Sequence, residues 1–128
     1  MSVLISALIL ASSAVECPSY IEDTQSLYKP VSGWEVLVGN QQKRLQAATV
    51  YIGHPNERAS LQPVKIKSGG WSWTQLPSNA WLECEYVASS IRLIRPLAEN
   101  DYCVFQDGDA GTNKPPSMKC THRSDRRK

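Results

Sequence analysis

The chain has 128 residues, and its 14 Lys and Arg nearly balance 12 Asp and Glu to leave a net charge of +2. This length suits one domain. The two histidines, His54 and His122, are too few and too far apart to build a tetrahedral metal site, so we expect neither a bound metal nor a cofactor.

Residues 1–14 are typical of a secretory signal peptide. An uncharged apolar run, 3–10, is followed by small residues, with Ser12 and Ala14 at the positions that signal peptidase requires. No Lys or Arg precedes the run, so either the α-amino group supplies the positive charge or the start codon is misassigned. The segment is shorter than the about 20 apolar residues of a membrane span. We therefore expect a periplasmic or secreted protein with no membrane insertion after cleavage.

Downstream of the signal, short apolar segments separated by turn formers predict strands and little helix. The expected strands span residues 34–38, 48–52, 61–66, 71–74, 81–87, 90–97, 102–106 and 117–120. Evenly spaced strands without helices between them indicate one mainly β domain, a small antiparallel β-sandwich or barrel, over residues 15–120.

The clearest hairpin turns at Ala88-Ser89. This two-residue link pairs Cys84 with Leu93 and Glu85 with Arg92, and it directs Cys84 into the core. A buried cysteine in an exported chain is most simply half of a disulfide.

The chain has four cysteines, Cys17, Cys84, Cys103 and Cys120, and this even number in an exported domain predicts two disulfides. No two are close enough in sequence for a zinc knuckle. Of three possible pairings we favour Cys84–Cys103, because a strand that begins at Tyr102 would return beside the hairpin and bring the Cα atoms within about 4.4–6.8 Å. Cys17–Cys120 then follows by elimination.

Basic residues crowd the C-terminus at Arg123, Arg126, Arg127 and Lys128. Residues 121–128 are expected to be a solvated, disordered tail. No aromatic residue lies among these charges, and the chain is exported, so nucleic acid is not an expected partner.

Residues 53–60 bring an imidazole, a carboxylate and a hydroxyl together in His54, Glu57 and Ser60. A catalytic triad needs such groups to converge in space, and no nucleophile elbow accompanies them. The turn-forming Pro55 and Asn56 favour a structural or recognition loop, and we expect no catalytic residue.

Trp71 and Trp73 lie two residues apart on an expected strand and therefore share a face. Exposed, they would form a recognition patch, since aromatic side chains anchor interfaces and stack on sugars. The competing interpretation, which aromatic alternation favours, is that this face packs into the core.

A set of residues with a characteristic order and spacing extends along nearly the whole expected mature chain. They are Cys17-Pro18, Ile21, Leu27, Gly33-Trp34, residues 53–63, residues 81–86, Leu97, Cys103 and Cys120. Their order and spacing resemble an uncharacterised family of small exported proteins of Gram-negative bacteria that is known by a locus-tag name. The resemblance implies periplasmic export and a shared disulfide frame, and it brings no activity, cofactor or catalytic residue.

The sequence favours a non-catalytic exported binding or accessory protein, with an envelope protein or a cell-wall glycan as ligand. A sharper alternative is an inhibitor or immunity protein against a cell-wall lytic enzyme, which would insert residues 54–60 into the enzyme's cleft. A second alternative is a small hydrolase that uses His54, Glu57 and Ser60.

We expect the mature protein to begin at Val15, after cleavage behind Ala14. Glu16 stands directly before Cys17, where a lipidation signal needs a small residue, so the cysteine should carry no lipid. Intact-mass measurement of periplasmic material checks both points. A diacylglycerol adduct on Cys17 would overturn the soluble assignment.

Overall fold

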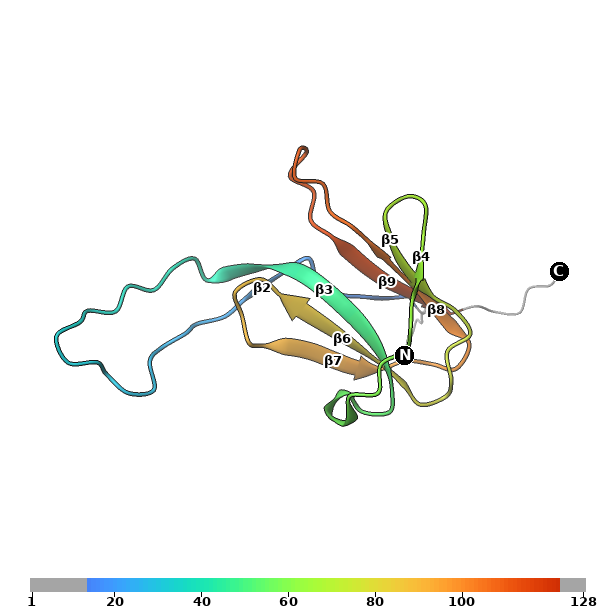
Figure 1. Cartoon of the computed structure of the whole chain (residues 1–128), viewed down its shortest axis with the longest axis horizontal. Helices are drawn as coiled ribbons and strands as arrows, with labels where there is room; N and C mark the ends of the chain where they lie inside the picture. Colours follow the sequence, from blue (N-terminus) through green and yellow to red (C-terminus); the bar gives the residue numbers. More distant parts are fainter. Residues whose placement is uncertain (1–13, 123–128) are drawn as a thin grey trace, which may run out of the picture.

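Two antiparallel β-sheets make up the computed structural model, which describes residues 14–122 (Figure 1). One sheet contains, in order, β1 (Val15–Glu16), β9 (Ser117–His122), β8 (Asp101–Gln106), β5 (Gly70–Trp73) and β4 (Val64–Lys65). The other contains β2 (Tyr20–Glu22), β3 (Gln42–Ile52), β6 (Ala80–Tyr86) and β7 (Arg92–Pro96). The one helical turn among the described residues is a 3₁₀ helix, η1 (Pro55–Glu57). The predicted fold class, mainly β and antiparallel, is confirmed.

The core lies between the sheets and draws on both of them. It consists of Cys17, Leu45, Val50, Trp73, Leu76, Ala80, Leu82, Cys84, Tyr86, Leu97, Cys103, Phe105, Met118 and Cys120. On β3 the inward positions change from odd to even numbers, because a bulge between Leu45 and Ala47 inserts one extra residue opposite β6. The bulge lets both Leu45 and Val50 reach the core from one strand.

The hairpin between β6 and β7 has the predicted register. Cys84 pairs with Leu93 and Glu85 pairs with Arg92, and Cys84 is buried in the core. β7 is an edge strand, and all five of its residues are exposed.

The predicted strand 34–38 is wrong. These residues lie in an irregular segment between β2 and β3, and their apolar side chains are exposed. The predicted strand 61–66 is reduced to β4, consistent with Pro63, which cannot donate to a ladder.

The predicted tail starts too early. Thr121 and His122 belong to β9, where they pair with Tyr102 and Asp101. The His122 Nδ1 lies 2.9 Å from Oδ1 of the buried Asp101, so this end of the strand is anchored. Residues 123–128 and the expected signal, apart from Ala14, lie outside the described residues.

The predicted disulfide pairing is wrong. Cys17 is bonded to Cys84, with Cα atoms 5.9 Å apart, and Cys103 is bonded to Cys120, with Cα atoms 3.9 Å apart. The prediction placed the strand from Tyr102 beside the β6–β7 hairpin, but β8 lies in the opposite sheet, where Cys103 is directly across from Cys120. The Cys17–Cys84 bridge therefore links the two sheets.

We expect non-reducing peptide mapping of the native protein to recover only Cys17–Cys84 and Cys103–Cys120 cross-links. Replacing the first pair (Cys17→Ser with Cys84→Ser) should lower the free energy of unfolding by about 4 kcal/mol, because that bridge closes the longer loop. The corresponding change at Cys103 and Cys120 should remove about 3 kcal/mol. Urea titrations measure both, and a larger loss from the short bridge would contradict the loop-length argument.

Candidate functional site

The predicted loop 53–60 is built around His54, which acts as a structural cap. Its Nδ1 accepts a hydrogen bond from the Asn56 N–H at 3.1 Å, at the start of η1. Its ring contacts the Trp81 ring with centroids 4.7 Å apart and planes tilted by 54°. Arg58 closes the turn in the left-handed region at φ 61°.

Glu57 and Ser60 do not complete a catalytic set with His54. Ser60 makes an isolated bridge to Tyr51, and no hydrogen bond joins the three side chains within residues 14–122. The loop is thus an ordered turn against β6, and its role in recognition stays a prediction.

The two predicted tryptophans have different environments. Trp73 is a core residue whose Nε1 donates to the Leu61 carbonyl at 3.2 Å. Trp71 is partly exposed, with the Lys65 ammonium 5.3 Å from its ring centroid. Both line one shallow depression, which also includes Ser60. Core packing therefore accounts for Trp73, whereas a recognition role for Trp71 stays a prediction.

A further group of exposed apolar side chains lies on a segment to which the sequence assigned no functional role. Residues 24–41, here called the arm, leave the sandwich between β2 and β3 and project far from both sheets, drawn in blue to teal at the left of Figure 1. Among the described residues, seven of the fifteen exposed large apolar side chains belong to it. They are Leu27, Tyr28, Val31, Trp34, Val36, Leu37 and Val38.

Exposure along the arm is extreme for side chains of this size. Leu37 is 96% exposed, Tyr28 is 95% exposed and Trp34 is 78% exposed. The arm's only charged residues are Lys29 and Glu35. Soluble proteins rarely expose contiguous apolar surface without a partner for it.

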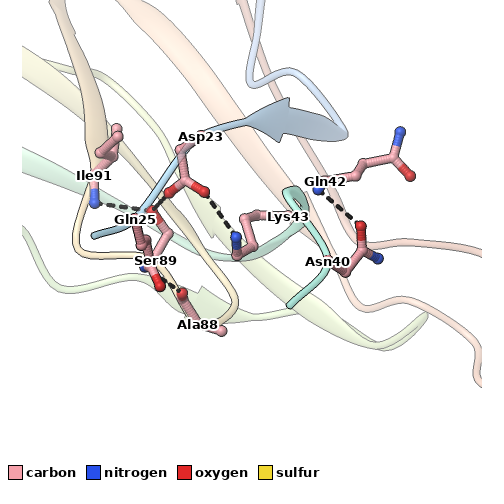
Figure 2. A network of polar contacts seen from close by, with 8 residues as sticks. All are labelled: Asp23, Gln25, Asn40, Gln42, Lys43, Ala88, Ser89 and Ile91. Atoms are coloured by element: carbon pink, nitrogen blue, oxygen red, sulfur yellow. Dashed lines mark hydrogen bonds and ion pairs between the residues drawn. The ribbon is translucent and has the colours of Figure 1, made fainter. Parts of the chain in front are cut away.

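The base of the arm is held by a buried ion pair. The Lys43 ammonium lies 2.7 Å from Oδ1 of Asp23, and both residues are buried. The Ser89 hydroxyl donates to the other oxygen of Asp23 and accepts from the Ile91 N–H at 3.0 Å (Figure 2). β2, β3 and the β6–β7 turn therefore meet at one carboxylate.

Further hydrogen bonds close the two ends of the arm against each other. The Asp23 N–H donates to the Gln41 carbonyl at 3.0 Å, and the Gln42 N–H donates to the Asn40 side chain at 3.0 Å. Gln25 Nε2 donates to the Ala88 carbonyl at 3.1 Å. A cavity of ≈ 610 Å³ lies beside these contacts, between arm residues such as Val36 and the β6–β7 turn.

The contacts of Asp23 with Lys43 and Ser89, here called the clamp, also favour the ionised form of its carboxylate. The hydrogen bond from Lys43, followed by that from Ser89, lowers the pKa of Asp23 below its ordinary value of 3.8, against the opposing effect of burial. The carboxylate is therefore ionised at neutral pH and can hold both partners.

A second buried carboxylate lies on the outer face of the four-stranded sheet. Glu83 accepts a hydrogen bond from the Tyr51 hydroxyl at 3.0 Å and lies 3.4 Å from the Arg92 guanidinium. Burial, and then this bond to Glu83, raises the pKa of Tyr51. The group is internally paired across three strands and is best explained as structural.

Sequence reasoning missed the arm and its clamp. The available signal was the density of large apolar residues in a segment interrupted by Pro30, Gly33 and Gly39, without the regularity of an amphipathic helix. Asp23, Lys43 and Ser89 are far apart in the sequence and gave no local signal.

We expect the clamp to make stability pH-dependent. Because the pKa of Asp23 is lowered in the folded chain, its contribution is fully present above pH 3.8 and is lost as the pH falls through the lowered pKa. Asp23→Asn should therefore lose less stability than the wild type on acidification, with Ser89→Ala intermediate. Urea unfolding at a series of pH values tests this, and identical pH profiles for the wild type and Asp23→Asn would contradict it.

Within residues 14–122 no helix is long and apolar enough to cross a bilayer. In the same residues, no three His, Cys, Asp or Glu side chains gather as candidate metal ligands.

Comparison with known proteins places the sandwich in a family. The model of the family described as Type VI secretion system Tli immunity protein matches residues 40–121, which include β3 to β8, all but the last residue of β9, and three of the four cysteines. No curated protein and no solved structure gives a significant match. The two disulfides fit the small disulfide-containing family that the sequence resembles. Since the match covers well over half of the chain, this protein belongs to the Type VI secretion system Tli immunity protein family.

Proposed function

We propose that this chain is an immunity protein that binds a type VI secretion effector in the periplasm and blocks its action. The observation that carries the proposal is the family match over residues 40–121. It favours the immunity alternative from the sequence over the more general binding or accessory role.

Two further observations support a periplasmic location. Both disulfides require an oxidising environment, and the bacterial periplasm supplies one. The apolar N-terminal segment of the sequence fits export.

An immunity protein acts by binding and requires no chemistry of its own. Within residues 14–122 no hydrogen bond joins the side chains of His54, Glu57 and Ser60, which supports this non-catalytic role over the hydrolase alternative. The partner is then an effector protein. A cell-wall lytic enzyme as that effector, and residues 54–60 as the inhibitory loop, are narrower proposals.

A candidate effector, sought among the genes that neighbour this one, provides the test. Directed to the periplasm of a sensitive host, it should inhibit growth, and the full-length chain should restore growth because the two proteins meet in one compartment. A variant lacking residues 2–14 should not protect, since it stays in the cytoplasm. The purified mature chain should form a complex with the effector on gel filtration.

Enzyme assays then identify the effector's chemistry. Peptidoglycan and phospholipid vesicles, both constituents of the envelope, are offered as substrates with and without an equimolar amount of the mature chain. Loss of peptidoglycan cleavage would support the lytic-enzyme proposal. Absence of both complex formation and protection would refute the immunity role.

A further inference from the structure

We infer that the arm, residues 24–41, is the element that docks on the effector, with Trp34, Leu37 and Tyr28 entering an apolar cleft of that protein. This inference rests on the proposed function, and it identifies the surface that performs it.

The arm is not needed to build the sandwich. No arm residue belongs to the core, and none of the partly buried apolar side chains that pack against the core comes from the arm. Apolar residues that contribute nothing to folding yet remain in contact with water favour aggregation. Their presence here is explained by burial against another molecule.

The chemistry of the arm indicates a protein as that molecule. Trp and Tyr dominate the energetic centres of protein interfaces, and both are present with large exposed areas. A segment that lies on a membrane normally carries a basic face that attracts anionic lipid. The arm has one cation, Lys29, and one anion, Glu35, so it offers no such attraction.

The clamp prepares the arm for binding. The contacts of Asp23 with Lys43 and Ser89 fix both ends of the arm against the β6–β7 turn, so part of the ordering entropy is lost before the partner arrives (Figure 2). Along the arm, the Trp34 N–H donates to the Val31 carbonyl at 3.1 Å across a turn in which Gly33 has φ +89°. The turn holds the indole of Trp34 out in solvent.

The test measures the affinity of the mature chain for the purified effector by calorimetry. Trp34→Ala and Leu37→Ser should each weaken binding about 30-fold, as expected for residues at the centre of an interface. The matched controls, Ile94→Ser and Val64→Ser, remove exposed apolar side chains from β7 and β4 and should change affinity less than about 3-fold. All four variants should retain a melting temperature close to that of the wild type, because each side chain lies outside the core.

A second variant covers the case in which the remaining apolar side chains of the arm compensate for a single substitution. Replacing residues 27–38 with a Gly/Ser segment of equal length keeps the clamp and the sandwich, and it should abolish complex formation while leaving the melting temperature near that of the wild type.

The results distinguish a failure of the arm inference from a failure of the proposed immunity role. If the wild type binds the effector and the arm variants bind equally well, the arm inference is wrong and the immunity role stands. If the wild type does not bind, both fail. Unchanged effector affinity combined with loss of vesicle binding by Trp34→Ala would assign the arm to a membrane. Unchanged affinity combined with loss of a wild-type dimer would assign it to a second copy of the chain, and either outcome overturns the inference.

Discussion

The Cys17–Cys84 bridge is the constraint on which the rest of the molecule depends. Immediately after β1 the chain leaves the five-stranded sheet, and this bridge ties the crossing point to β6 in the other sheet. The Tyr86 hydroxyl donates to the Pro18 carbonyl at 2.8 Å and holds the next residue. β2 then follows in a fixed place beside β3, and its last residue leads directly to Asp23. The bridge thus positions the base of the arm as well as the core.

The features that the sequence predicted correctly are local ones. A two-residue link leaves little freedom in pairing, so the partners of Cys84 and Glu85 followed from the turn alone. The disulfides depend instead on which sheet β8 joins, and that choice is made by packing between segments distant in sequence. Likewise β9 extends to His122, because Asp101 on β8 anchors a residue that composition assigned to a tail.

The sequence did not predict the candidate site correctly, for a related reason. His54, Glu57 and Ser60 were singled out because reactive side chain types were adjacent, whereas the fold uses His54 to cap a turn. The mostly apolar residues 34–38, bounded by Gly33 and Gly39, predicted a strand. An apolar segment indicates a surface that needs to be covered, and it does not say whether the cover lies in the same chain. Here the chain provides none, and the surface stays exposed.

The buried Asp23–Lys43 pair is hard to explain as a stabilising device alone. Removing both charges from water carries a penalty that their attraction offsets only with good geometry and added hydrogen bonds, which Ser89 supplies. An apolar pair of similar size would fill the same space, but it would not set the direction in which two chain ends leave the sandwich. The polar clamp is directional, so it fixes where the arm begins and ends. Most of the stability resides in the core and the bridges, and beyond its pH-dependent share the clamp provides orientation, the property that a recognition segment requires.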